Sequence, residues 1–316
     1  MRLRRQRGVA LLVAIVIFAI ATTVAAAVTY NKAMSARRAA ATFTLEAALQ
    51  AGMAAESLAS IALEDAGSKQ QITTVQDWAQ EQPPMEIPDT GIWIQARVED
   101  LGGRFNLNSL VKWDNNEFVE DKHQLEVFRT LLGSLDIDTK YADLLMDWID
   151  PDLQPAPSGG GEDTLYLSQA PPYRPANTFI MHPSELLALP GFGRENYQKL
   201  APYVAALPND EKVNVCTASG LVLDAVLNQH TTQYANMDLP SFREKGCFPE
   251  KRDYTIAIPD PTQKGEVEGR VDELSSWFRL RTQVRIGTAD FVLYSVLYVE
   301  PNGKKSRTVQ RSFGSE

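Results

Sequence analysis

The sequence has few of the residues that enzymes use for metal and nucleophilic chemistry. It contains two cysteines, Cys216 and Cys247, and three histidines, His123, His182 and His230, which are far apart. We find no Cys-x-x-Cys pair, zinc-type spacing, phosphate-binding loop or Ser-His-Asp signature. No enzyme class is indicated, and we expect that the protein is not an enzyme.

Positive charge is scarce outside the first eight residues. Those eight carry Arg2, Arg4, Arg5 and Arg7 and no acid, which leaves 27 Lys and Arg against 40 Asp and Glu in the remainder, a net charge near −13. General nucleic-acid binding needs a positive field, so an acidic body argues against it. Cation binding is compatible with this balance. The length of 316 residues fits two ordinary domains, or one domain with a large insertion.

A long uncharged run follows these arginines. Val9 to Val28 contains no charge, which is about the 20 residues needed to cross a bilayer core. Because cationic residues flanking a membrane segment stay in the cytoplasm, the N-terminus is predicted to be cytoplasmic. The rest of the chain then lies on the outer side of the inner membrane.

Three kinds of segment fit this pattern. One is a secretory signal peptide cut near Ala25 to Ala27, and another is an uncleaved signal anchor. The third is a prepilin-like leader cut between Gly8 and Val9. We favour the third because the apolar run continues without proline, as a helical pattern, to Ala66. Small and apolar residues mark one face of that helix: Leu45, Ala48, Leu49, Gly52, Ala55, Ala59 and Leu63.

The start of this helix resembles a known family. Arg7-Gly8 followed by the apolar run from Val9 to Ile15 is similar to the leader of type II secretion pseudopilins. Those proteins normally carry Glu at the fifth position after the cut, but here it is Val13. One branch of the family, the large minor pseudopilin K, lacks that Glu. A carboxylate in a membrane is costly unless its charge is matched, and a subunit at the filament tip has no neighbour above to match it. The resemblance implies cleavage between Gly8 and Val9 by the prepilin peptidase and N-methylation of Val9.

Strand patterns occur on both sides of a helical region. Residues 92–98 predict a strand, and residues 277–286, 291–299 and 306–313, separated by turn signals, predict an antiparallel meander. A shorter apolar run, 254–258, precedes the meander. The segment 101–108 resembles a signature of the K branch, and on its own physics it predicts a hairpin turn and a second strand.

Residues 109–208 have helical spacing throughout. The predicted helices include one around residues 125–135, one over 141–149, one over 184–189 that begins after Pro183, and one over 197–206. A short strand and a helix are expected within 214–228. We therefore predict an α+β protein with the pseudopilin fold, a long N-terminal transmembrane helix plus an antiparallel sheet, into which a large all-α domain is inserted.

The expected division of the chain has five parts. They are a leader (1–8), a transmembrane helix (9–29) continuing to about residue 68, the first strands (90–108), the inserted α-domain (109–212) and the remaining pseudopilin body (213–316).

The densest polar cluster lies within the expected α-domain. It contains Asp143, Asp147, Asp150 and Asp152, then a glycine run and Glu162, Asp163 and Tyr166. Many carboxylates beside a glycine-rich loop suit Ca²⁺, a hard cation that prefers oxygen ligands. The spacing is not that of an EF-hand, and a solvated acidic loop is the alternative. The resemblance to the K branch implies calcium binding here, and the predicted ligands are Asp150, Asp152, Glu162, Asp163 and a backbone carbonyl near Tyr166. A carbohydrate enzyme using Glu162 as an acid–base group is a weak third hypothesis.

Residues 189–193, Leu-Pro-Gly-Phe-Gly between two helices, look like a helix-hairpin-helix. Such hairpins can bind DNA phosphates through backbone N–H groups. The nearby cations, Arg194 and Lys199, are opposed by Glu185 and Glu195. The alternative function is therefore a membrane-anchored DNA-binding protein of a DNA-uptake apparatus, and a structural turn is the simpler interpretation.

Export would also decide the state of the cysteines. Two cysteines in an oxidising compartment often pair, and a bond between Cys216 and Cys247 would be worth about 3–4 kcal/mol in a chain-entropy model. The resemblance implies a periplasmic body and minor pseudopilin partners called I, J and H, with no nucleic acid. It also implies a place at the tip of the pseudopilus, where secreted proteins or the outer-membrane channel could be contacted.

Overall fold

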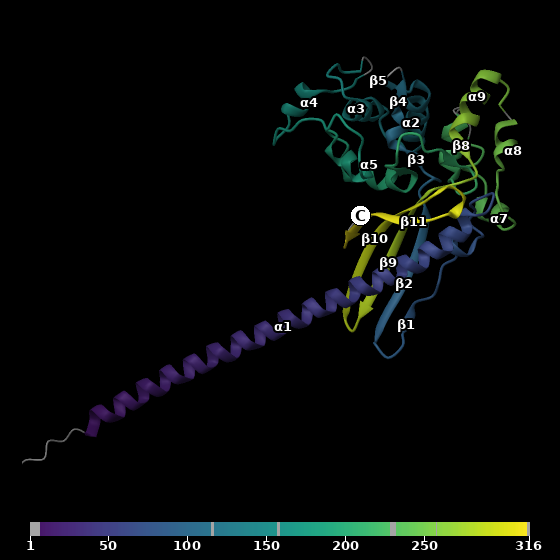
Figure 1. Cartoon of the computed structure of the whole chain (residues 1–316). Coiled ribbons are helices and arrows are strands. Elements are labelled where there is room, and N and C mark those ends of the chain that lie inside the picture. The colour runs from purple at the N-terminus through teal and green to yellow at the C-terminus, as the bar shows by residue number, and fades with distance from the viewer. Residues whose placement is uncertain (1–6, 115–116, 157–158, 228–231, 257, 315–316) are drawn as a thin grey trace, which may run out of the picture.

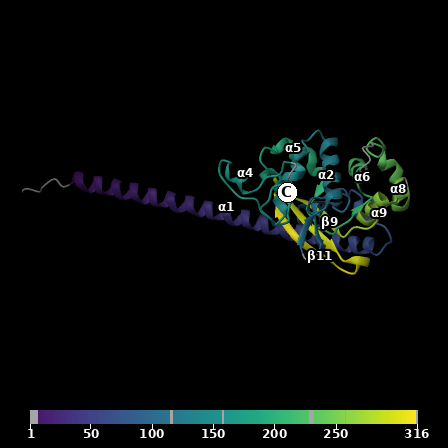
Figure 2. The same ribbon diagram turned by 90° about the horizontal axis from the view of Figure 1, so that it is seen from above.

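The computed structural model describes residues 7–114, 117–156, 159–227, 232–256 and 258–314. A long N-terminal helix leads to an antiparallel sheet, and a mainly helical body lies beside the sheet at the far end of that helix (Figure 1). The view from above shows the same three parts, with the first half of the helix projecting away from the rest (Figure 2).

Helix α1 (Arg7–Gly67) is continuous over 61 residues, about 90 Å at the usual helical rise. All residues from 9 to 33 are exposed. The second half of α1 packs on the sheet through small side chains, and Ala48, Ala51 and Ala55 are buried there. A Cβ on Gly52 would come within 2.8 Å of the Leu293 side chain. The small residues on this face therefore let the helix and sheet approach closely.

The sheet has five strands in the order β1-β2-β9-β10-β11, and every neighbouring pair is antiparallel. The strands are β1 (Met85–Ile87), β2 (Ile92–Asp100), β9 (Trp277–Ile286), β10 (Ala289–Val299) and β11 (Ser306–Phe313). Alternate residues of β9, including Phe278, Leu280 and Val284, are buried against α1. The predicted meander and the strand predicted over residues 92–98 are confirmed, as is the α+β combination of a long N-terminal helix with an antiparallel sheet.

The helical body is inserted between β2 and β9. Its helices are α2 (Lys122–Ser134), α3 (Lys140–Ile149), α4 (Asp163–Leu167), α5 (Gly193–Leu200), α6 (Gly220–Leu227), α7 (Leu239–Arg243), α8 (Lys251–Ile256) and α9 (Pro261–Arg270). Short 3-10 turns are η1 (Asp77–Ala79), η2 (Leu107–Leu110), η3 (Pro183–Ala188), η4 (Ala201–Tyr203) and η5 (Pro301–Gly303). Three short strand pairs complete the body. One is antiparallel, β4 (Val111–Asp114) with β5 (Glu117–Glu120). Two are parallel, β3 (Phe105–Asn106) with β6 (Val204–Ala205) and β7 (Val213–Asn214) with β8 (Val271–Asp272).

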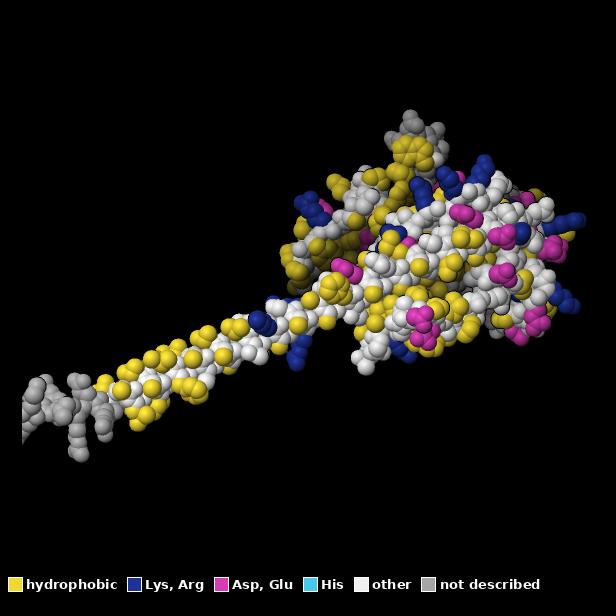
Figure 3. Space-filling view, turned by 60° about the horizontal axis from the view of Figure 1, so that its bottom comes forward, with side chains coloured by type: hydrophobic (Ala, Val, Ile, Leu, Met, Phe, Trp, Pro, Cys, Tyr) yellow, Lys and Arg dark blue, Asp and Glu magenta, His cyan; other side chains and the backbone are white. Residues whose placement is uncertain are grey.

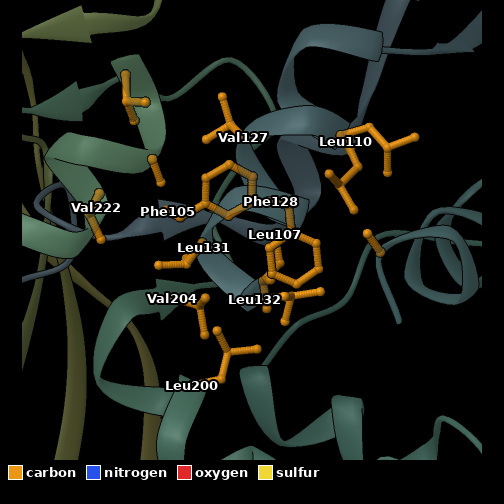
Figure 4. Packing of buried hydrophobic residues seen from close by; sticks show 14 of the residues in the cluster. Phe105, Leu107, Leu110, Val127, Phe128, Leu131, Leu132, Leu200, Val204 and Val222 are labelled. Atoms are coloured by element: carbon orange, nitrogen blue, oxygen red, sulfur yellow. The ribbon is translucent and has the colours of Figure 1, made fainter. Parts of the chain in front are cut away.

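One continuous hydrophobic core fills this body. It runs from Phe105 to Val271 and includes α6 side chains such as Val222. Phe105 stacks on Phe128 of α2 with ring centroids 5.3 Å apart. Figure 4 shows these rings in one cluster with residues of α2, η2, α5 and α6. Helices on both sides of residue 212, the expected end of the α-domain, share this core, which continues to β8.

Some local expectations need correction. Residues 105–106 do not form a hairpin strand but pair in parallel with β6. The predicted helix over 197–206 begins at Gly193 and ends at Leu200, and the segment over 184–189 is the 3-10 turn η3. Residues 254–256 of the apolar run 254–258 form the second half of the short helix α8. Tyr254 is fully buried there and donates a hydrogen bond to the Leu223 carbonyl of α6.

The junction between sheet and helical body is held by a buried carboxylate. Asp100, at the end of β2, accepts hydrogen bonds from Ser275 (2.6 Å), Thr217 (2.6 Å) and Asn214 (3.1 Å). Burial raises the pKa of Asp100 despite these donors. The insertion is thus tied to the sheet close to where the chain leaves it and returns.

Candidate metal centre and membrane helix

The acidic cluster lies where α3 ends and the following loop returns to α4. One carboxylate oxygen from each of Asp150, Asp152 and Glu162 lies within 4.8 Å of the others. Asp150 and Glu162 are buried, with 9% and 6% of their surface exposed, whereas Asp152 is exposed. The structure therefore brings together three of the predicted ligands from two segments of the chain.

Three carboxylate oxygens of this cluster lack hydrogen-bond partners within the described part of the chain. Oδ1 of Asp150 and both carboxylate oxygens of Glu162 are buried there without a hydrogen bond. Burial, and then the neighbouring carboxylates, raise the pKa of Asp150 to about 7 and that of Glu162 to about 7. Buried polar atoms without partners cost free energy, and a bound cation would remove that cost for both residues.

The other two predicted ligands, Asp163 and the Tyr166 carbonyl, already have partners within the protein. The Asp163 carboxylate is 3.6 Å from the Arg174 guanidinium. The Tyr166 backbone carbonyl accepts hydrogen bonds from the N–H groups of Gln169 and Tyr173, while its ring is fully buried. Asp163 does not belong to the group formed by Asp150, Asp152 and Glu162.

Asp147 is a fourth acid at this site that the predicted ligand set omits. Its carboxylate is fully buried and accepts the Ala156 N–H at 3.0 and 3.2 Å, which fixes the start of the loop. Burial raises its pKa to about 6. The three-residue spacing from Asp147 to Asp150 places both on one face of α3, and that spacing is the signal that could have identified it. Asp143 lies one turn earlier and pairs with Arg129 at 2.6 Å.

The first part of α1 has the properties of a membrane segment. It is long and apolar enough to cross a bilayer, with a mean hydropathy of 2.8 over 18 residues, and none of that window is buried in the protein. Figure 3 shows apolar side chains around this end of the helix, followed by dark-blue side chains at mid-length. Gly8 and Val9 lie in the first turn of α1, whereas the leader residues 1–6 lie outside the described part.

Apolar residues remain exposed on α1 beyond the membrane length. They include Phe43 (71%), Leu58 (63%) and Ile61 (65%). The opposite side of this part of the helix contacts the sheet through Ala48, Ala51 and Leu63. A row of exposed apolar side chains on a helix marks a surface for contact with other helices or proteins.

The helix-hairpin-helix candidate is built into the core. Phe192 is buried, with 2% of its surface exposed. The Gly191 carbonyl accepts a 2.6 Å hydrogen bond from Tyr141 of α3. Gly191 and Gly193 have φ of +78° and +71°, which glycine adopts without strain. Lys199 is paired with Glu195 at 3.3 Å. The segment therefore serves as a structural turn between η3 and α5.

Cys216 and Cys247 are joined by a disulfide in the structure, with their Cα atoms 4.5 Å apart. The bond links the segment after β7 to the loop before α8. Cys216 is fully buried in the core of the helical body, so the bond fastens that loop to the core.

Comparisons with known proteins fit this architecture. Residues 103–209 match the family described as Type II secretion system (T2SS), protein K. The chain is 32% identical to the type II secretion system protein K of Pectobacterium carotovorum subsp. carotovorum, over 98% of this chain and 97% of that protein. It is 31% identical to protein K of Pseudomonas aeruginosa, over 98% and 94%. The chain belongs to the type II secretion system protein K family.

Protein K is a minor pseudopilin, so the sequence-based assignment is confirmed and the DNA-binding alternative has no support. The fold also matches a chain in the crystal structure of the GspK–GspI–GspJ complex from enterotoxigenic Escherichia coli. That match has a TM-score of 0.75 and 22% identity, and it covers 88% of this chain and 100% of the other. At that identity the likeness concerns the fold.

Proposed function

We propose that this protein is a structural subunit at the tip of the periplasmic pseudopilus, where it begins filament assembly and aids export of folded proteins across the outer membrane. Helix α1 carries this proposal. The exposed first half of α1 is long enough to span a membrane. The second half continues the same helix, packs on the sheet with one side and exposes apolar residues on the other. The N-terminus would be cytoplasmic and the body periplasmic, after the prepilin peptidase cuts between Gly8 and Val9 and Val9 is methylated.

The partners follow from the same helix. The related complex contains GspI and GspJ together with GspK, and we propose that their counterparts, with an H subunit joining, pack along the exposed side of α1. The helical body lies at the end of α1 remote from the membrane segment (Figure 1). That bulk would obstruct a further subunit placed above it in a thin filament, which supports a terminal position.

Assembly is tested by co-purification of the full chain with its partner minor pseudopilins. The double variant Leu58→Asp/Ile61→Asp puts charges on the exposed side of α1, 63% and 65% exposed, without touching the core. We expect the complex to be lost. Leu187→Asp, a 47% exposed residue of η3, is the control and should leave the complex intact. If the α1 variant is present in the membrane in the same amount as the wild type and still retains the complex, this packing surface is rejected.

We also propose a calcium ion at the acidic cluster. Asp150, Asp152 and Glu162 would hold it, and hard carboxylate oxygens suit Ca²⁺. The ion would neutralise the crowded carboxylates and fix the loop between α3 and α4, so its role is structural. The unpartnered buried oxygens of Asp150 and Glu162 support this fit.

Isothermal titration of chelator-treated protein with Ca²⁺, and separately with Mg²⁺, tests the site. Glu162→Gln should weaken Ca²⁺ binding at least ten-fold. Asp138→Asn, which changes an exposed acid before α3 paired with Lys140, is the matched control and should not alter it. Saturable binding that survives Glu162→Gln unchanged would place the ion elsewhere.

A further inference from the structure

The sheet face that points away from α1 carries a concentration of arginine. Leu280 and Thr282 of β9 are buried on the α1 side, so Arg279 and Arg281 lie on the other side. Strand pairing sets Arg97 of β2 directly opposite Arg281. Arg104, from the turn after β2, reaches the same place. We call these four arginines the basic sheet face.

Within the described part of the chain, one carboxylate, that of Glu99, pairs with three of these arginines. Glu99 is 2.5 Å from Arg279, 2.9 Å from Arg104 and 3.8 Å from Arg97. Among the described residues Arg281 has no ion-pair partner. Like charges directly opposite on neighbouring strands destabilise a sheet, so the Arg97–Arg281 pair is not explained by folding. The basic sheet face therefore concentrates arginine in a chain whose net charge is −9.

Other acids near this face are already engaged. Glu211 accepts a 2.7 Å hydrogen bond from the Trp277 indole N–H. Glu185 accepts the backbone N–H groups of Met181 (2.6 Å) and His182 (3.1 Å) in the cap of η3. Neither carboxylate is paired with the exposed Arg97 or with the half-buried Arg281 in the described residues.

An apolar cleft of about 510 Å³ adjoins the basic sheet face. It lies between the sheet and the overhanging helical body, and Arg104 and Arg279 form part of its lining. Apolar lining comes from Trp277, Tyr294 and Val296 of the sheet and from Met181 of the body, which is 74% exposed. Its volume is in the range of ligand sites. Strand β11, an edge of the sheet, borders it with Val309, which is 51% exposed.

We propose that the basic sheet face and this cleft bind an extended acidic segment of a partner protein from outside the filament. Its carboxylates would pair with Arg97 and Arg281, and an adjacent apolar side chain would fill the cleft. Charge complementarity selects the acidic residues, and the apolar lining beside β11 favours a peptide over a bare polyanion. The inference that this segment belongs to a protein outside the filament rests on the assembly proposed above, because subunits packed along α1 would lie on the opposite side of the sheet.

Fluorescence anisotropy of a labelled peptide tests this directly. The probe is a ten-residue peptide of alternating Glu and Gly with one central Phe, titrated with the full-length chain in an uncharged detergent. The comparison peptide replaces each Glu by Gln. We expect saturable binding of the acidic peptide, at least ten-fold weaker binding of the neutral peptide, and a decrease in affinity with added salt.

Two variants and their controls locate the contact. Arg97→Gln/Arg281→Gln should weaken acidic-peptide binding at least ten-fold, whereas Arg285→Gln, on β9 but paired with Asp290, should change it less than two-fold. Met181→Ala should weaken binding about three-fold, with Leu187→Ala as its control. Circular dichroism checks the fold of each variant, and partner co-purification should be unchanged in all of them.

Three outcomes would overturn the proposal. They are no saturable binding of the acidic peptide, equal binding of the neutral peptide, and equal losses in the arginine variant and its control. Tighter, Arg281-dependent binding of a short single-stranded DNA or of anionic lipid vesicles would assign the face to a nucleic acid or a membrane instead. None of these results would bear on assembly along α1, which co-purification measures separately.

Discussion

At the scale of single residues, Glu56 joins α1 to the sheet. It is buried, and its carboxylate accepts hydrogen bonds from Ser295 at 2.5 Å and Arg311 at 2.8 Å. Arg311 is half-exposed and could be hydrated without its partner, so Glu56→Gln should lower the free energy of unfolding of the body by about 1–3 kcal/mol. Urea denaturation followed by circular dichroism measures this. Glu126→Gln, an exposed acid of α2, is the control.

The same residue gives a pH dependence. Burial raises the pKa of Glu56, but Arg311, Ser295 and Thr308 outweigh burial and hold its pKa below the ordinary 4.5. A lowered pKa in the folded state stabilises the protein above the unfolded-state pKa, and that contribution is lost as pH falls through the folded-state value. The difference in unfolding free energy between wild type and Glu56→Gln should be constant from pH 6 to 8 and shrink below about pH 4.5. A difference that grows in acid would contradict this assignment.

Gly160 forms part of the cradle of the acidic loop. A Cβ there would lie 2.0 Å from Asp147 Oδ2 and 2.7 Å from the Ala156 nitrogen. Gly160→Ala should therefore shift the loop and lower the melting temperature of the calcium-saturated protein. Gly133→Ala, in helix α2 with nothing within 4 Å, should be neutral or stabilising by up to about 1 kcal/mol. Equal melting temperatures for the two variants would show that the loop does not depend on this contact.

The candidate ligands were only partly predictable at this scale. Local acidic density identified Asp150, Asp152 and Glu162, which the structure groups together. The direction of Asp163 depends on Arg174, eleven positions later, and the Tyr166 carbonyl on the turn that follows it. The spacing of residues along the chain does not predict such long-range and backbone partners.

At the scale of elements, the disulfide fixes a loop that has little regular structure. The bond closes a separation of 31 residues, for which chain entropy predicts about 3–4 kcal/mol. Cys216→Ala/Cys247→Ala should lose about that much unfolding free energy in urea. Adding a reductant should bring the wild type close to the variant and leave the variant unchanged. A reductant effect of equal size on both would mean that the cysteines are not the cause.

Long, strongly periodic elements were predictable, and short ones were not. Helix α1 and strands β9, β10 and β11 follow from hydrophobic patterns alone. Strand β3 forms only because β6, about 100 residues later, lies beside it. Helix α8 has strand-like residues, but burial of Tyr254 against α6 overrides that preference. Tertiary packing decides such segments.

At the scale of the whole molecule, the insertion could be predicted, but the extent of the core that it joins could not. The helical pattern weakens near residue 212, yet the core continues to Val271. Short helices separated by loops give no periodic signal that says which core they join. The segment at residues 101–108 and strand β8 mark the two ends of the insertion better than a change in residue composition does.

The central claim is that α1 is the anchor of a processed pseudopilin. Intact mass and N-terminal sequence of the membrane-extracted chain, expressed with and without the prepilin peptidase, test it most directly. We predict a chain that begins at Val9, N-methylated, only when the peptidase is present. A chain that begins near Val28 in both cases would contradict the claim, because the N-terminal part of α1 would then be a signal peptide that is removed from the mature protein.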